Sequence, residues 1–267
     1  MPDTPPPSNP ANPPAPLFPP GSWDPAAKAY AFLADFTLIN WQGHLAVQTP
    51  NIHTLGAEIA DLVSKSASRD AAAADIAAQA GSTLPAWSSL LGTPTDKPET
   101  WQLVYAVELI GRMVSMHYKR VIRRPRPQQI SPDLAGPLPM PQSPSYPGGH
   151  ATEAFLIAEC LSVISPSLHD DAMALAASIA ANREIAGLNF ASDTTAARQL
   201  ASDVIKLLQN STGFCTVLGY AKSEYPQTST TPASEASTLF GSIVPTHRPA
   251  ETPGGLRQGD EGGGGGW

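Results

Sequence analysis

Apolar residues recur every three or four positions along most of the chain, and the alternation typical of strands is almost absent. The pattern is strongest in an Ala- and Leu-rich middle region, where it predicts helices. Seven ranges carry it: 24–48, 54–66, 69–80, 100–123, 150–164, 169–187 and 193–209. No repeat of solenoid length is visible, so the pattern indicates a single all-α domain.

Two charged residues lie in the apolar rows of the last two predicted helices. Arg183 extends one row and Asp193 begins the other, so both are predicted to face the core. A buried charge without a partner is costly, so each needs a partner or a function. Arg183 could pair with an acidic neighbour, and Asp193 could cap the helix that follows it. The rows are Ala172, Ala176, Ile179 and Arg183, then Asp193, Ala197, Leu200 and Val204.

Proline and glycine mark the boundaries of the predicted domain. The chain has 29 prolines and 21 glycines in 267 residues, concentrated at its two ends. Residues 1–20 are predicted to be a disordered Pro-rich arm, residues 21–222 the helical domain, and residues 223–267 a flexible tail rich in Ser, Thr, Pro and Gly. Inside the domain, the prolines of residues 124–149 predict an irregular loop, and long loops of this kind often carry function.

Charge and composition exclude several classes of protein. The net charge of −7 argues against a nucleic-acid binder, which would usually be basic. The two cysteines, Cys160 and Cys215, form no metal-binding pattern, and Cys160 is interpreted as a small core residue. No apolar run is long enough for a membrane span and no secretory signal is recognisable, so a cytoplasmic location is expected.

A cluster of basic residues lies at the start of the predicted loop. It has three interpretations: cations that favour the C-terminal dipole of a helix, an anion site, or a nucleic-acid patch. The proline after Arg126 holds that arginine in an extended conformation, which fixes its direction. The basic residues are Lys119, Arg120, Arg123, Arg124 and Arg126.

A glycine pair introduces the next predicted helix. In PSYPGGHATEAF, residues 144–155, Gly148 and Gly149 stand directly before His150. Unpaired backbone N–H groups at such a helix start can bind an anion, and His150 is placed to act as a general acid or base. The glycines could equally serve the turn alone, with His150 as a cap of the helix.

Together with NREIAGLNFASD, residues 182–193, these segments resemble the superfamily of type 2 phosphatidic acid phosphatases, bacterial class A acid phosphatases and vanadium-dependent haloperoxidases, in its soluble bacterial subset. The family pattern is Lys, six residues, Arg-Pro; then Pro-Ser-Gly-His; then Ser-Arg, five residues, His, three residues, Asp. The first part is complete here, from Lys119 to Arg126 and its proline. The second part reads Pro-Gly-Gly-His at 147–150, and the third has Asn-Arg, then Asn189, then Asp193.

The resemblance implies a helical bundle of the acid phosphatase and haloperoxidase type, which can form a homodimer. It also implies that a first histidine is the acid/base group, here His150, and that a second histidine attacks phosphorus or ligates vanadium. An aspartate, here Asp193, orients the second histidine, whose position is taken by Asn189. The implied oxyanion ligands are Lys119, Arg126, Arg183 and the amides of Gly148 and Gly149.

Asn189 is the main departure from the family pattern. Its amide nitrogen has a delocalised lone pair, so it is neither a nucleophile nor a vanadium ligand, although it can donate a hydrogen bond to an oxyanion. Gly148 lacks the hydroxyl of the family's serine, and Asn182 replaces a second serine in a milder change. His44 or His117 could substitute for the missing histidine only if folding brought one of them to the pocket.

The expected function is therefore a pocket for a phosphate-containing small molecule or another oxyanion, with phosphoester hydrolysis weak or lost. No metal and no certain cofactor are expected, and vanadate is disfavoured because its ligand is missing. The alternatives are a non-catalytic anion-binding or interaction protein, a vanadium-dependent haloperoxidase, and a changed chemistry in the same pocket.

Overall fold

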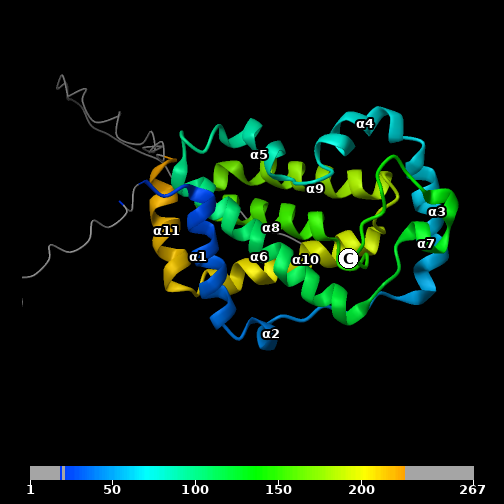
Figure 1. The fold of residues 1–267 in the computed structure, drawn as a ribbon, viewed down its shortest axis with the longest axis horizontal. Helices are drawn as coiled ribbons and strands as arrows, with labels where there is room; N and C mark the ends of the chain where they lie inside the picture. Colours follow the sequence, from blue (N-terminus) through cyan, green and yellow to red (C-terminus); the bar gives the residue numbers. More distant parts are fainter. Residues whose placement is uncertain (1–18, 20–21, 226–267) are drawn as a thin grey trace, which may run out of the picture. The chain divides into compact units, whose positions relative to one another are not determined.

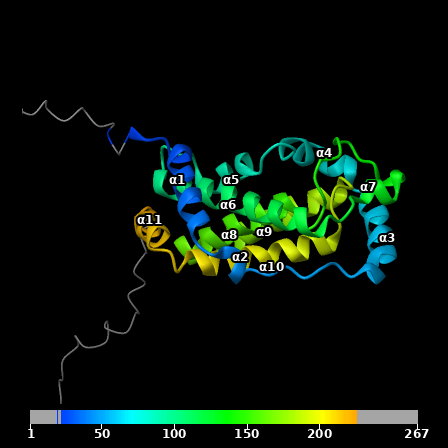
Figure 2. The same ribbon diagram turned by 60° about the horizontal axis from the view of Figure 1, so that its bottom comes forward.

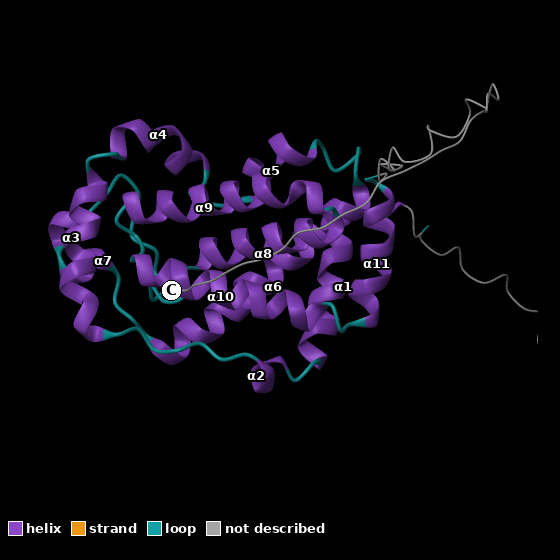
Figure 3. Cartoon of the chain, turned by 180° about the vertical axis from the view of Figure 1, so that it is seen from behind, coloured by secondary structure: helices purple, strands orange, loops and turns teal. Residues whose placement is uncertain are grey.

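The structure is a computed structural model, and it describes residue 19 and residues 22–225. The predicted Pro-rich arm, apart from residue 19, and nearly all of the predicted tail lie outside the described residues. Within the described part of the chain there are eleven α-helices and no strand, which confirms the all-α class (Figures 1 and 3). The helices are α1 Pro25–Leu38, α2 Trp41–His44, α3 Leu55–Ser66, α4 Arg69–Ala78, α5 Leu84–Leu91, α6 Pro98–Ile122, α7 Pro127–Ile130, α8 Gly149–Ile164, α9 His169–Ile185, α10 Ala191–Leu208 and α11 Thr212–Ser223.

Helix α8 is the centre of the bundle and packs against α6, α9 and α10 (Figure 2). It is apolar on almost every side, as expected for a helix that other helices surround. Cys160 in this helix is fully buried, which confirms its role as a small core residue, and burial raises the pKa of its thiol to about 12. Helices α1 and α11 pack on α6 at one end of the bundle, and α3 and α7 lie at the other end (Figures 1 and 3). None of the described helices combines the length and the apolar character that crossing a membrane requires.

The predicted helix over 24–48 was wrong in its length. Helix α1 ends at Leu38, Ile39 is extended, and the short α2 begins at Trp41. The break turns the Trp41 ring back into the core, where it stacks on Phe36 with ring centroids 6.0 Å apart. Burial of a large aromatic ring therefore outweighs the continuation of a helical apolar pattern.

Besides the short α7, two helices were not predicted. Helix α5 has eight residues with a proline in its first turn, so its apolar pattern is too short to stand out from the loop around it. Helix α11 buries one narrow face, made by Phe214, Leu218 and Ala221, against the far end of α6.

The loop at 124–149 is mostly irregular, as predicted, but it contains one helical turn, α7, and a 3-10 turn at Pro132–Leu134. Proline begins both turns, at a position where a missing N–H costs nothing. Arg69 fixes the loop, because its guanidinium donates to the backbone oxygens of Leu134, Ala135 and Ile185. Gly187, at φ +72°, allows the close approach, since a Cβ there would lie 2.2 Å from the Leu134 oxygen.

Candidate functional site

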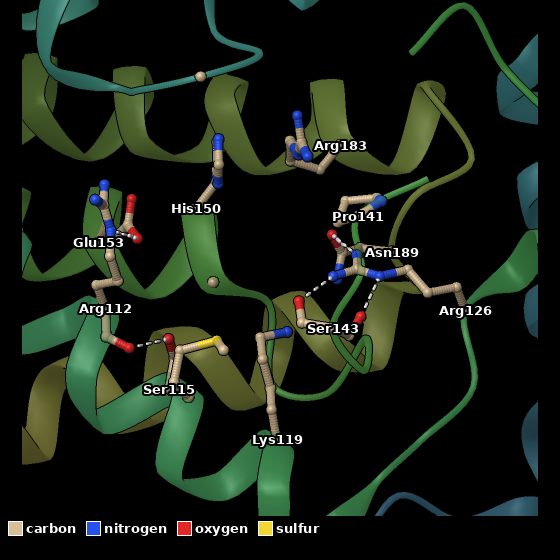
Figure 4. Close-up of a pocket in the computed structure, with 13 residues that line it drawn as sticks. Arg112, Ser115, Lys119, Arg126, Pro141, Ser143, His150, Glu153, Arg183 and Asn189 are labelled. Carbon is tan, nitrogen blue, oxygen red and sulfur yellow. Dashed lines mark hydrogen bonds and ion pairs between the residues drawn. The ribbon is translucent and has the colours of Figure 1, made fainter. Parts of the chain in front are cut away.

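A cavity of about 230 Å³ lies where α6, the start of α8 and the end of α9 meet the loop that precedes α8 (Figure 4). Six of the eight predicted site residues line it, namely Lys119, Arg126, Gly149, His150, Arg183 and Asn189. Gly148 and Asp193 do not. The other lining residues are Gly81, Arg112, Ser115, Met116, Pro141, Ser143 and Glu153.

Lys119 reaches the cavity from the last turn of α6, with only 2% of the residue exposed. Its Nζ donates to the backbone oxygens of Pro144 at 2.7 Å and Ser145 at 2.8 Å. Two of its three N–H groups are therefore committed, and one remains for a ligand. Burial, together with the nearby charge of Arg126, lowers the pKa of Lys119 to about 7.

Arg126 is more firmly committed to the protein than Lys119. Its Nε donates to the backbone oxygen of Ser143 at 2.8 Å. Its two Nη atoms donate to four further acceptors: the backbone oxygens of Leu188 and Pro144, Asn189 Oδ1 and the Ser143 hydroxyl. A guanidinium has five N–H groups, so all of them are used. Burial lowers the pKa of Arg126 to about 10. Arg126 therefore supplies positive charge and holds the cavity wall, but offers no free donor.

Arg183 lies near the end of α9 and forms no ion pair within the described part of the chain, so the ion-pair alternative is not observed. Its Nε is buried and has no hydrogen-bond partner among the described residues. Burial lowers the pKa of Arg183 to about 10, while the charge of Glu153 acts in the opposite direction. Of the three predicted cationic ligands, Arg183 is therefore the one that still needs an acceptor.

His150 is the second residue of α8, and its ring lies near the backbone of Gln79 and Ala80, which follow α4. The side chain does not cap the helix, so that alternative is not observed. Its buried Nε2 forms no hydrogen bond of good geometry with the described residues, although backbone groups of Gln79 and Ala80 lie close enough to the ring to act on its pKa. Burial and the charge of Arg183 lower the pKa of His150 to about 4, so the imidazole is neutral near pH 7.

The backbone amides at the start of α8 differ from one another. The backbone N–H of Gly148 donates to the backbone oxygen of Asp193 at 3.0 Å. This amide therefore cannot make its expected contribution to anion binding. The first bond within the helix runs from the Thr152 N–H to the Gly148 oxygen. The N–H of Gly149, which lines the cavity, precedes that bond and has no partner within the helix.

Asn189 uses both of its amide protons on the protein. Its Nδ2 donates to the Ser145 oxygen at 3.0 Å and to Asp193 Oδ2 at 3.1 Å. Its Oδ1 accepts from Arg126 Nη1 at 3.4 Å. The expectation that Asn189 could donate to an oxyanion is therefore wrong for this arrangement, because neither N–H is free.

Asp193 is fully buried behind Asn189. Its Oδ2 also accepts from the Phe190 N–H at 2.8 Å, so it caps α10 from inside the first turn rather than from the predicted cap position. Its Oδ1 accepts from Arg124 Nη1 at 2.8 Å, and Arg124 Nη2 pairs with Glu58 Oε2 at 2.7 Å. The basic cluster pointed to Arg124, whereas no sequence pattern pointed to Glu58 on α3.

A second group of charges was also missed. Glu153 Oε1 accepts from Arg112 Nε at 3.1 Å, and Arg112 Nη2 pairs with Glu108 Oε1 at 2.5 Å. Burial raises the pKa of Glu153 to about 7. The available signals were the four-residue spacing of Glu108 and Arg112, and the position of Glu153 one turn after His150 in an apolar helix.

No second histidine reaches the cavity from the described residues. His117 packs edge-on against Trp41, with ring centroids 5.0 Å apart, and His44 lies in α2. No group of three or more His, Cys, Asp and Glu side chains that could hold a metal ion occurs in the described part of the chain. The cavity thus has several cations, a neutral histidine and one carboxylate, but an amide where the attacking atom is expected.

Comparison with known proteins identifies the segment that holds the cavity. Residues 100–208 match the family model of the PAP2 superfamily, and this range contains all eight predicted site residues. No curated protein matches the chain. Among solved structures, the chain is similar to a transmembrane PAP2-type phosphatidylglycerolphosphate phosphatase from Bacillus subtilis, with a TM-score of 0.46 and 19% identity over 75% of this chain and 98% of that chain.

Proposed function

We propose that this chain, which carries a PAP2 superfamily segment, binds a phosphate-like oxyanion in the cavity and hydrolyses phosphomonoesters weakly or not at all. The observation that carries the proposal is the state of Asn189. It occupies the position of the attacking histidine in the family pattern, and its Nδ2 is bonded to Ser145 and Asp193. Its carboxamide oxygen is a hydrogen-bond acceptor and not a nucleophile for phosphorus.

Oxyanion binding is supported by the donors that the protein leaves unused. The Arg183 guanidinium, one N–H of Lys119 and the Gly149 amide lie around one cavity. Arg binds phosphate oxygens in pairs and Lys binds them as a point charge, so the two types complement each other. Arg126 adds positive charge without a direct bond. A bound anion would compensate for the hydration that these buried cations have lost.

Weak or absent hydrolysis follows from the missing covalent step. In the family chemistry that the resemblance implies, a histidine attacks phosphorus and a second histidine protonates the leaving oxygen. The position of His150 in the cavity wall supports the second role, but no second histidine for the first role is among the described residues that line the cavity. Loss of the attacking group in a well-studied hydrolase costs on the order of 10⁶-fold in rate.

Calorimetry and a turnover assay on the same preparation test both halves of the proposal. We expect inorganic phosphate and tungstate to bind at one site per chain. We expect the protein not to hydrolyse p-nitrophenyl phosphate at a measurable rate. Absence of binding at millimolar ligand would overturn the binding half. Robust turnover that His150→Ala abolishes would overturn the hydrolytic half, because it would require an attacking group other than residue 189.

A further inference from the structure

Three of the seven buried side-chain polar atoms that lack a partner among the described residues belong to the wall of this one cavity. They are His150 Nε2, Arg183 Nε and Glu153 Oε2. Buried polar atoms in folded proteins are nearly always hydrogen-bonded, so their concentration here indicates that a ligand completes the set. A tetrahedral anion can accept from His150 and Arg183, but Glu153 needs a different group.

Glu153 is only half satisfied by the protein. It is 3% exposed, and its Oε1 accepts from Arg112 Nε, which belongs to a guanidinium shared with Glu108. Its Oε2 has no donor in the part of the chain that the structure describes. Burial raises the pKa of this carboxyl to about 7, which is the expected result of incomplete compensation. Inorganic phosphate can offer Oε2 only its own P–OH group, and the dianion of a phosphomonoester has no such group, so a donor on the organic part is needed to complete the set.

Glu153 lies on the opposite side of the cavity from Asn189 and Arg126, with Lys119 between the two sides (Figure 4). Arg183 is close enough to Glu153 for their charges to interact, so a ligand whose anion binds Arg183 and Lys119 can reach Glu153 with its organic part. The cavity volume of about 230 Å³ corresponds to about seven or eight waters at the ~30 Å³ that each occupies in the liquid. That is room for a phosphate group and a short organic chain of a few heavy atoms.

We infer that Glu153 gives the cavity a preference for small phosphomonoesters whose organic part carries a hydroxyl or amine hydrogen-bond donor. This inference rests on the proposed oxyanion binding. The phosphate group takes its hydrogen bonds from Arg183, Lys119 and the Gly149 amide. The donor on the organic part binds Glu153 Oε2, the carboxylate oxygen that has no partner among the described residues in a wall otherwise rich in donors.

Paired ligands test the preference on the unaltered protein. Calorimetry would compare phosphoethanolamine with ethyl phosphate and glycerol phosphate with propyl phosphate, with inorganic phosphate as the reference. We expect the donor-bearing member of at least one pair to bind about tenfold more tightly, as one hydrogen bond to a charged group predicts. Preference in the first pair identifies an ammonium group, and preference in the second identifies a hydroxyl. Equal affinities within both pairs, with phosphate still bound, would overturn the inference alone.

Glu153→Gln assigns the preference to one atom. Because Arg112 Nε donates to the position of Oε1, the glutamine should place its oxygen there and its NH₂ in the cavity, where it can no longer accept. We expect the preference to disappear and the phosphate affinity to stay within about threefold. Glu159→Gln is the matched control, since it removes the same charge from the same helix outside the cavity, and it should keep the preference. A preference that survives Glu153→Gln would overturn the inference. Loss of phosphate binding by the unaltered protein would instead overturn the proposed function.

Discussion

The two sides of the cavity wall treat their polar groups in opposite ways. On the Asn189 side, the N–H groups of Asn189 and Arg126 and both oxygens of Asp193 are hydrogen-bonded to one another, to backbone or to the side chains of Arg124 and Ser143. On the Arg183 side, His150, Glu153 and Arg183 each keep a buried polar atom without a partner among the described residues. The residues of both sides lie within one segment of about a hundred residues, so the contrast is local.

This difference separates residues that stabilise the fold from residues that bind a ligand. A buried group whose bonds are complete contributes to the stability of the fold, whereas a buried group without a partner reduces it unless a ligand is bound. Under the proposed function, the Asn189 side contributes to the stability of the fold and the Arg183 side binds the ligand. Changes on the first side should alter the free energy of unfolding, and changes on the second should alter ligand affinity.

The largest effect is expected for Asp193→Ala. The change leaves Arg124 without its second carboxylate and removes the acceptor of the Asn189 amide and of the Phe190 N–H. Breaking one partner out of a buried ion pair costs roughly 3–5 kcal/mol, so we expect a loss of this size in the free energy of unfolding, measured by urea denaturation.

Asp203→Ala is the control on the same helix, since Asp203 lies in an exposed contact with Lys206. Its change in unfolding free energy should stay within about 0.5 kcal/mol. Similar values for the two variants would show that the bonds of Asp193 are not what stabilises the Asn189 side.

Arg183→Met should give the next largest effect, and on affinity instead of stability. Loss of a paired charge-assisted contact is expected to weaken phosphate binding about a hundredfold, or ~3 kcal/mol, by calorimetry. The free energy of unfolding should be unchanged or higher, because an unpaired buried charge is removed. Arg198→Met, on the exposed surface of α10, should change neither quantity. An unfolded Arg183→Met would contradict the assignment of Arg183 to ligand binding.

A smaller effect is expected from pH. The pKa of Lys119 is lowered to about 7 and that of Glu153 is raised to about 7, so both hold a proton below this pH and lose it above. As pH rises, Lys119 loses its positive charge and Glu153 gains a negative charge, so the net charge of the cavity falls by two units while His150 stays neutral. Sulfate is a suitable probe because its own charge is constant in this range.

We expect sulfate to bind about tenfold more tightly at about pH 6 than at about pH 8. This factor corresponds to a bound anion that raises the pKa of one of the two groups by about one unit. Calorimetry at the two pH values measures the ratio. Lys119→Met should flatten the profile. Affinity that is constant or rises with pH would mean that these two groups do not face the anion.

The fold was predictable where a helix has one long apolar row. Helices α3, α4, α6, α8, α9 and α10 were all predicted close to their observed bounds. The break between α1 and α2 could not be predicted, because it depends on where the Trp41 ring finds space in the core. Helices α5 and α11 are short, and the few apolar residues of each can be recognised as a buried face only once α5 is seen to pack on α9 and α11 on α6.

The site was predictable as a set of residues but not as a set of bonds. Spacing and family resemblance pointed to Lys119, Arg126 and Arg183, and the structure brings them to one cavity. Which of them has donors left for a ligand depends on the path of the loop before α8. The backbone oxygens of that loop accept hydrogen bonds from Arg126 and from two of the three N–H groups of Lys119. Glu153 was not predicted as a site residue, because an unpartnered oxygen has no sequence signature.

The most direct test of the account is a search for a covalent phosphoenzyme. Intact-protein mass spectrometry would follow the unaltered chain and Asn189→His after incubation with a reactive phosphomonoester. An imidazole at 189 can donate one N–H to Asp193 and keep the other nitrogen's lone pair for the cavity. The account predicts a phosphorylated adduct in Asn189→His and none in the unaltered chain. A phosphoenzyme in the unaltered chain would contradict it.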